Sequence, residues 1–87
     1  MRVYVLVPTV DGEACTPTVF TDESRARNVL DEEYEDKLFE IMTRTDNDER
    51  YYSYDKGLNS ARIEYKSNGY NVSDVWTWDI FETELEE

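Results

Sequence analysis

Residues 21–44, TDESRARNVLDEEYEDKLFEIMTR, form the most regular pattern in the sequence. The hydroxyl of Thr21 can cap a helix N-terminus, and the acidic side chains that follow favour the positive end of a helix dipole. When successive residues are placed about 100° apart, one narrow stripe is apolar, and it contains Ala26, Leu30, Tyr34, Leu38 and Ile41. The pattern predicts an amphipathic helix from about Asp22 to about Arg44.

Two short strands are expected before this helix. Residues 2–7 alternate with β-branched side chains and predict the first strand. Asp11-Gly12 is a turn signal. Residues 16–20 predict the second strand, and Pro17 suits an edge position because proline has no N–H to donate to a strand ladder.

Residues 47–67 predict a second helix. Asp46 and Glu49 have the spacing of a capping box, and the side chains that recur at helical intervals are Tyr51, Tyr54, Leu58, Ala61 and Tyr65. Because Gly57 weakens a helix, a later start at Asp55 with residues 51–54 extended is an alternative.

Residues 72–85 are rich in β-branched and aromatic side chains and predict the longest strand. Its side chains alternate between two faces, with Trp76, Trp78 and Ile80 on one and Val75, Phe81 and Leu85 on the other. Both faces are partly apolar. A strand of this kind belongs in the middle of a sheet, so we expect it beside the N-terminal strand.

The expected fold class is α+β, with a small three-stranded mainly antiparallel sheet and one or two helices packed on one face. The expected strands are Arg2 to Val7, Thr16 to Phe20 and Val72 to Leu85. The expected core consists of Val3, Val5, Val7, Phe20, Ala26, Leu30, Tyr34, Leu38, Ile41, Leu58 and Ile80. A chain of 87 residues is long enough for one hydrophobic core, so we expect residues 1–87 to form a single acidic domain.

Acidic residues outnumber basic residues by 21 to 9, which gives a net charge of −12. Proteins that bind nucleic acid draw affinity from Lys and Arg that displace counterions, so direct binding to nucleic acid is disfavoured. The same charge opposes docking on an anionic membrane. We therefore expect a partner with a basic protein surface, and no nucleic-acid or membrane partner.

The expected location is the cytoplasm. Cys15 is the only cysteine, so an intrachain disulfide is excluded and a secreted disulfide scaffold is not expected. No apolar run approaches the roughly 18 residues of a membrane span. The first eight residues lack the long apolar region of a signal peptide.

The sequence offers little for catalysis or for metal binding. It contains no histidine, which removes the usual general base and the commonest metal ligand. Cys15 follows Glu13 closely with no cation nearby in sequence, which disfavours its thiolate. A calcium loop that starts at Asp46 fails because its fifth and sixth positions are Arg50 and Tyr51. We expect a non-catalytic protein without catalytic residues, metal site or cofactor.

The candidate binding residues lie mainly on the face of the first helix that points away from the core stripe: Asp31, Glu32, Glu35, Asp36 and Glu40. Glu32, Asp36 and Glu40 form an i, i+4 row with carboxylates about 6 Å apart along the axis, a spacing similar to that of phosphates along one DNA strand. Phe39 lies among these acids, as an interface residue or as a core residue beneath the C-terminal strand. The acidic end of the chain completes the expected partner-binding set with Glu82, Glu84 and Glu86.

In composition and charge layout the chain resembles the small acidic DNA-mimic inhibitors of phages and mobile elements, of the anti-CRISPR or anti-restriction type. Residues 31–36, Glu40 and residues 82–87 carry the resemblance. It implies a viral protein of the host cell cytoplasm that inhibits a nuclease, CRISPR effector or restriction enzyme. Inhibition would come from occupation of the cationic DNA or PAM site of that enzyme.

Two alternatives stay open. The chain is also compatible with a generic protein-interaction module, such as an antitoxin, an assembly adaptor or a phage accessory protein, which could form a homodimer through its aromatic strand. Many acids together with more Arg than Lys are also typical of proteins from a halophilic source. Acids gathered on one face would favour DNA mimicry, whereas an even spread would argue against it.

Overall fold

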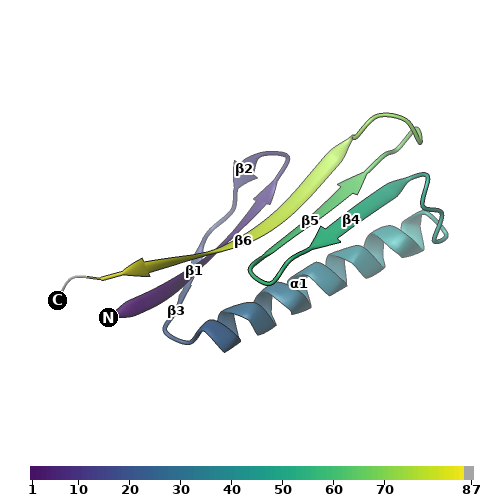
Figure 1. Ribbon diagram of the computed structural model, residues 1–87. Helices are drawn as coiled ribbons and strands as arrows, with labels where there is room; N and C mark the ends of the chain where they lie inside the picture. Colours follow the sequence, from purple (N-terminus) through teal and green to yellow (C-terminus); the bar gives the residue numbers. More distant parts are fainter. Residues whose placement is uncertain (86–87) are drawn as a thin grey trace.

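The first and last strands of the chain form the centre of the sheet (Figure 1). In the computed structural model, which describes residues 1–85, β1 (Arg2–Val10) pairs antiparallel with β6 (Asp74–Glu84) along its whole length. On the far side of β6 lie β5 (Ser60–Tyr65) and then β4 (Tyr52–Lys56). The expected central position of the C-terminal strand beside the N-terminal strand is confirmed.

The outer edge of β1 is covered by two short strands, β2 (Glu13–Ala14) and β3 (Thr18–Phe20). Asp11 and Gly12 connect β1 to β2 with φ angles of 53° and 86°, which is the two-residue hairpin turn that the sequence indicates. Pro17 lies between β2 and β3, where it interrupts the edge. The expected edge strand therefore exists, but it begins at Thr18 and not at Thr16.

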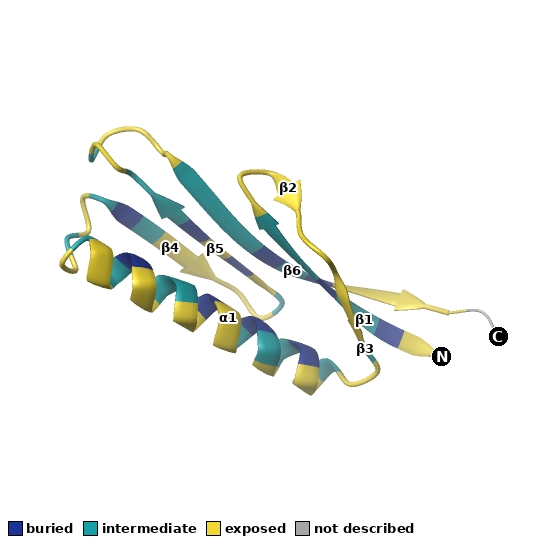
Figure 2. Cartoon of the chain, turned by 180° about the vertical axis from the view of Figure 1, so that it is seen from behind, coloured by how far each residue is buried: buried dark blue, intermediate teal, exposed yellow. Residues whose placement is uncertain are grey.

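The helix α1 (Glu23–Arg44) lies along one face of the sheet (Figures 1 and 2). Its N-cap is Asp22 and not Thr21, because the Asp22 carboxylate accepts a hydrogen bond of 2.9 Å from the Ser24 N–H. Asp46 and Asn47 follow the helix with positive φ angles of 53° and 60°. These two residues therefore turn the chain after α1 and do not start a second helix.

The expected fold class is wrong in its sheet and in its second helix. The structure has a six-stranded sheet instead of three strands, and α1 is the one helix in residues 1–85. The region of the expected second helix forms the β4–β5 hairpin. Tyr52 and Ile63, 4% and 0% exposed, follow strand alternation and form its core face, whereas Leu58, expected in the core, is 69% exposed in the connecting turn.

The core lies between α1 and the sheet. The helix contributes Ala26, Leu30, Tyr34 and Ile41 as expected, with Leu38 and Phe20 half-buried against the same cluster. The sheet side consists of Leu6, Tyr52, Ala61, Ile63, Trp78 and Ile80. Trp76 is half-buried, with the Lys37 Nζ 5.2 Å from the centroid of its ring. Trp78 is therefore core, and Trp76 is covered from one side by a helix cation.

The prediction of which face of β1 lies in the core is wrong. Leu6 is 1% exposed and belongs to the core cluster, together with the half-buried Tyr4. Because side chains alternate along a strand, Val3, Val5 and Val7 point to the opposite face. Val3 is still buried there, whereas Val5 and Val7 are only half-buried. We call this second side of the sheet, over which no described element packs, the open face.

Candidate functional site

Four acids form a continuous exposed surface on the middle of α1, which we call the acidic helix face: Glu32, Glu33, Glu35 and Asp36. Figure 2 shows that exposed residues line the outer side of the helix. Within residues 1–85 none of the seven ion pairs includes any of the four. The acidic helix face is therefore an uncompensated patch of negative charge.

The other two helix acids of the expected site are neutralised by neighbours. The Asp31 carboxylate lies 2.7 Å from the Lys56 Nζ of β4. Glu40 accepts hydrogen bonds from the Lys37 Nζ at 3.0 Å and from the Arg44 guanidinium at 2.9 Å. The Lys37 hydrogen bond, followed by its charge, lowers the pKa of Glu40. The expected row of three carboxylates therefore has two uncompensated members, Glu32 and Asp36.

Phe39 points into solvent from the acidic side of the helix. Its side chain is 73% exposed, so it does not pack beneath the C-terminal strand. Residues three, four and seven positions apart share a helix face, which places Phe39 beside Glu32, Glu35 and Asp36. An exposed ring surrounded by carboxylates is an arrangement that suits an interface, because the ring gains area on burial while the acids give charge complementarity.

The acids near the C-terminus do not join this patch. Glu82 pairs with Arg2 across the β1–β6 ladder at 2.8 Å, and Glu84 is exposed. Figure 1 shows that the C-terminal end of β6 extends beyond the N-terminal end of α1, whereas the acidic helix face lies midway along the helix. The third expected tail residue, Glu86, lies outside the described residues.

Glu33 is a site residue that the sequence interpretation left out. Its spacing from Leu30 and Tyr34 places it on the flank of the helix, close to the core stripe, yet it is exposed. Partial burial and, second, the charge of Glu32 raise its pKa. Its unbroken run with Asp31 and Glu32 was the available signal, because a charge at the edge of an apolar stripe extends to solvent.

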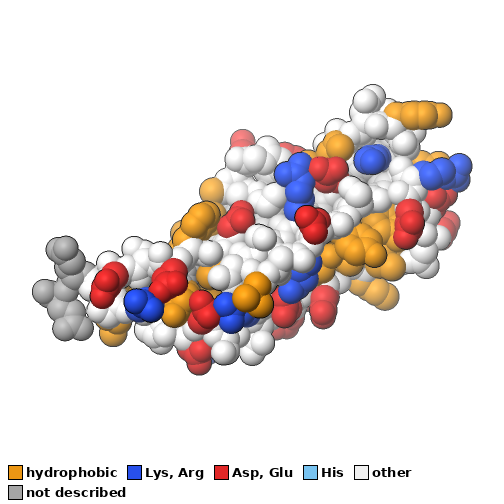
Figure 3. Space-filling model, viewed as in Figure 1, with side chains coloured by type: hydrophobic (Ala, Val, Ile, Leu, Met, Phe, Trp, Pro, Cys, Tyr) orange, Lys and Arg blue, Asp and Glu red, His pale blue; other side chains and the backbone are white. Residues whose placement is uncertain are grey.

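The remaining charges are distributed over the surface. Seven of the nine basic residues form ion pairs, and acidic and basic groups are interspersed on the face in Figure 3. Arg25 is an exposed cation on the outer side of α1, two turns before Glu32. The acidity is thus spread widely, and acids elsewhere such as Glu13, Glu49 and Glu84 also have no ion-pair partner within residues 1–85. The acidic helix face differs from the rest because four such acids lie close together on one helix.

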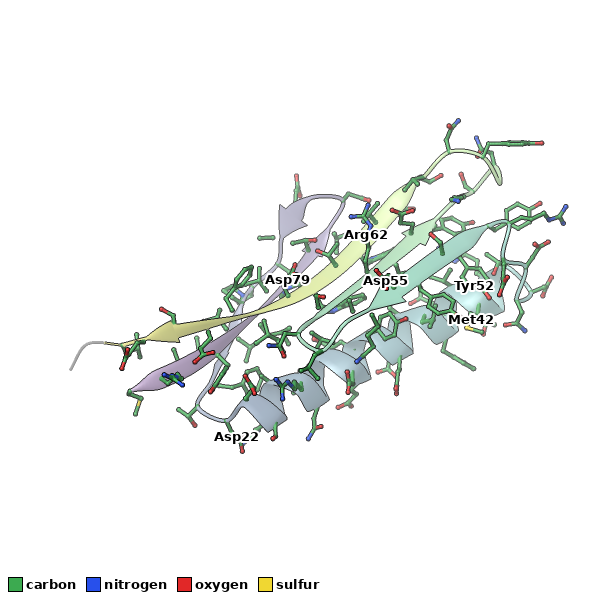
Figure 4. All side chains as sticks on the ribbon, viewed as in Figure 1. Asp22, Met42, Tyr52, Asp55, Arg62 and Asp79 are labelled. Atoms are coloured by element: carbon green, nitrogen blue, oxygen red, sulfur yellow. The ribbon has the colours of Figure 1, made fainter. Side chains whose placement is uncertain are left out.

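The open face carries a shallow polar hollow over β4, β5 and β6. Asp55, Arg62 and Asp79 line it, and Figure 4 labels these three side chains on β4, β5 and β6. Arg62 lies opposite Asp55 in the β4–β5 ladder, and its guanidinium is held by Glu64 at 2.7 Å. In residues 1–85 no cluster of Cys, Asp or Glu has the geometry of a metal site. Cys15 is exposed between β2 and β3.

No protein-family model, curated protein or solved structure matches this chain. In the described part of the chain, α1 is too polar to serve as a membrane-spanning helix.

Proposed function

We propose that this protein is a non-catalytic acidic ligand for a basic protein surface, and that the surface is the DNA or PAM site of a nuclease, CRISPR effector or restriction enzyme. The protein would inhibit that enzyme by DNA mimicry. The observation that carries the proposal is the acidic helix face, where Glu32, Glu33, Glu35 and Asp36 have no ion-pair partner within residues 1–85 while Phe39 stands exposed beside them.

The pairing of the other helix acids supports this choice of surface. Asp31 and Glu40 lie on the two flanks of α1 and are compensated by Lys56, Lys37 and Arg44. Glu32, Glu35 and Asp36 therefore occupy the outermost part of the helix, where a partner can reach them without contact with the sheet, and Glu33 lies on the adjoining flank. Arg and Lys side chains that hold phosphates form comparable charge-assisted hydrogen bonds with carboxylates.

A protein-interaction module that uses the open face is the second candidate. Val19 and Phe81 are 60% and 57% exposed, and both are cross-strand neighbours of Val5. Exposed apolar side chains on adjacent strands are typical of a contact surface. The halophilic interpretation draws on the acids outside the helix, since Glu13, Glu49 and Glu84 also have no ion-pair partner within residues 1–85. It does not account for four such acids beside an exposed Phe39 on one helix.

The test is a DNA-cleavage assay on a panel of restriction endonucleases and RNA-guided nucleases, with the purified protein as inhibitor. We expect inhibition of at least one enzyme that weakens as substrate DNA rises and as salt rises from about 50 to 200 mM. The double reversal Glu32→Lys with Asp36→Lys should reduce inhibition at least tenfold, because like charges would then face each other.

The matched control is Glu13→Lys with Glu49→Lys, which changes the net charge equally at two exposed positions away from the helix face. It should inhibit within about twofold of the wild type, since exposed charges outside an interface contribute little to binding. Equal loss of inhibition in both double variants, or inhibition that ignores DNA concentration, would reject the acidic helix face as a DNA mimic.

A further inference from the structure

One half of β6 has a neighbouring strand on only one side. β5 pairs with residues 74–79, whereas β1 pairs with residues 76–84. Beyond Ile80 no described strand lies along the edge that faces away from β1. We call residues 80–84 on this side the free edge of β6. In Figure 1 this end of the strand extends past the β4–β5 hairpin.

The hydrogen-bond pattern shows which main-chain groups occupy the free edge. Met1 and Leu85 exchange main-chain hydrogen bonds of 3.2 and 2.7 Å, so the odd-numbered residues of β6 point their main-chain groups at β1. The even-numbered residues point away from it. The Ile80 N–H already bonds to the Asn59 carbonyl at 2.9 Å. The next groups of the same row belong to Glu82 and Glu84, and they continue the ladder without a partner strand in residues 1–85.

The side chains along the free edge differ between the two faces of the sheet. Phe81 and Thr83 lie on the open face and are exposed, with Phe81 at 57%. Glu82 and Glu84 lie on the other face, where Arg2 compensates Glu82. A strand added here would place alternate side chains beside Phe81 and beside the two carboxylates. It would therefore be best matched if it alternated apolar and basic residues.

The charge of the free edge also excludes a second copy as its best occupant. An antiparallel pair of two β6 edges would place Glu82 and Glu84 of one copy against the same acids of the other, and like charges across a ladder are destabilising. The outer edge of β4 would select less strongly for the charge of an added strand, since Asp55 and Lys56 carry opposite charges at adjacent positions. The strands β2 and β3 have only two and three residues.

We propose that the free edge of β6 binds an extended basic segment of another protein by strand addition, with alternating apolar and Lys or Arg side chains. Main-chain hydrogen bonds to Glu82 and Glu84 hold the segment. The unpaired carboxylate of Glu84 selects its charge, helped by Glu82, whose exposed pair with Arg2 is weak enough to be shared with a second cation. This edge lies at the end of the molecule away from the acidic helix face, so it is a second, independent binding site and does not depend on DNA mimicry.

The test uses a seven-residue peptide that alternates lysine and valine, blocked at both ends and titrated into the ¹⁵N-labelled protein. We expect the largest amide shifts at residues 80–84. Glu82→Pro should weaken binding of the peptide at least tenfold, because it removes one N–H that points to the free edge and leaves the hydrogen bonds to β1 intact. Glu82→Gln with Glu84→Gln should weaken it about fivefold or more, whereas the matched Glu13→Gln with Glu49→Gln should not.

Two peptide controls keep the test independent of whether Glu82→Pro folds. N-methylation of alternate peptide amides should abolish the shifts, and replacement of lysine by glutamate should do the same. Shifts confined to α1, equal affinity for the N-methylated peptide, or no binding at millimolar peptide would each overturn the proposal. So would a wild-type dimer in sedimentation experiments that Glu82→Pro converts to monomer, since the occupant would then be a second copy.

Discussion

The phenol ring of Tyr34 meets the indole of Trp78 edge-on, with ring centroids 6.0 Å apart and ring planes at 87°. This contact joins α1 to the central strand β6 within the buried core cluster. We predict that Tyr34→Ala lowers the free energy of unfolding by about 3–5 kcal/mol, as for other buried aromatic side chains. Urea unfolding followed by tryptophan fluorescence measures this loss.

Tyr34→Phe is the matched control because it keeps the ring. The Tyr34 hydroxyl makes no hydrogen bond within residues 1–85, so its removal should change the unfolding free energy by less than about 1 kcal/mol. If Tyr34→Phe were as destabilising as Tyr34→Ala, the ring contact would not be what joins the helix to the sheet.

The pH dependence of stability should reveal the contact between Asp74 and Asp11. Partial desolvation, and then the charge and hydrogen bond of Asp11, raise the pKa of Asp74 above its ordinary value of 3.8. A raised pKa in the folded state means that protonation of Asp74 favours folding. The ionised Asp74 carboxylate therefore destabilises the folded state at neutral pH, and this destabilisation disappears as the pH falls toward about 4. We expect Asp74→Asn to raise the Tm at pH 7 and to reduce the gain on acidification.

Further acidification should have the opposite effect through Glu40 and Glu64. Hydrogen bonds from Lys37 and Arg62 lower the pKa values of these two carboxyls. Their contribution is therefore present above the ordinary pKa of about 4.5 and is lost as the pH falls through the lowered folded values. Circular dichroism measures the Tm at each pH for the wild type and for Asp74→Asn. If the Tm of both proteins fell steadily from pH 7 downward, Asp74 would not be a source of increased stability on mild acidification.

Gly12 should be required for the β1–β2 turn because of its backbone alone. Its φ is +86°, and a Cβ added there would meet no atom within 4 Å. We predict that Gly12→Ala destabilises the protein by about 1 kcal/mol, since left-handed backbone is unfavourable for alanine. Gly12→Asn should be milder because asparagine tolerates this conformation. Thermal unfolding of both variants measures the difference, and equal Tm values would contradict this explanation.

Substitution of Phe39 should affect partner binding without affecting stability. Because its ring is 73% exposed, Phe39→Ser should change the unfolding free energy by no more than about 0.5 kcal/mol. If the acidic helix face binds a partner, the same variant should speed dissociation from that partner. A large drop in Tm would show instead that Phe39 contributes to the fold.

The first helix could be predicted from the sequence because its apolar stripe has one interpretation. Ala26, Leu30, Tyr34 and Ile41 are all buried, and no strand pattern would place them on one face. The β4–β5 hairpin could not be predicted with the same ease. Tyr54, Ala61 and Tyr65 satisfy helical spacing and strand alternation together, and only the buried Tyr52 and Ile63 distinguish the two patterns.

The inward face of β1 was ambiguous for a related reason. Valines alternate with Tyr4 and Leu6, so both faces are apolar, and the larger side chains take the core side. For the candidate binding surface, the sequence placed Glu32, Glu35 and Asp36 correctly on the outer helix face, and it left Phe39 open between that face and the core. It could not show that Lys56 on a distant strand pairs with Asp31, because that strand was expected to be helix.

Because β1 pairs with β6, the central ladder of the sheet can form only late in synthesis. The residues of β1 pair with residues of β6 that are far away in the sequence. These pairs run from Arg2 with Glu84 to Val10 with Trp76. During synthesis on a ribosome β1 emerges before β6, so of its neighbours in the sheet only β2 and β3 are present until β6 is made. Such high contact order slows folding because a long loop must close before the central ladder forms. Formation of the central ladder, and with it the complete sheet, therefore depends on β6.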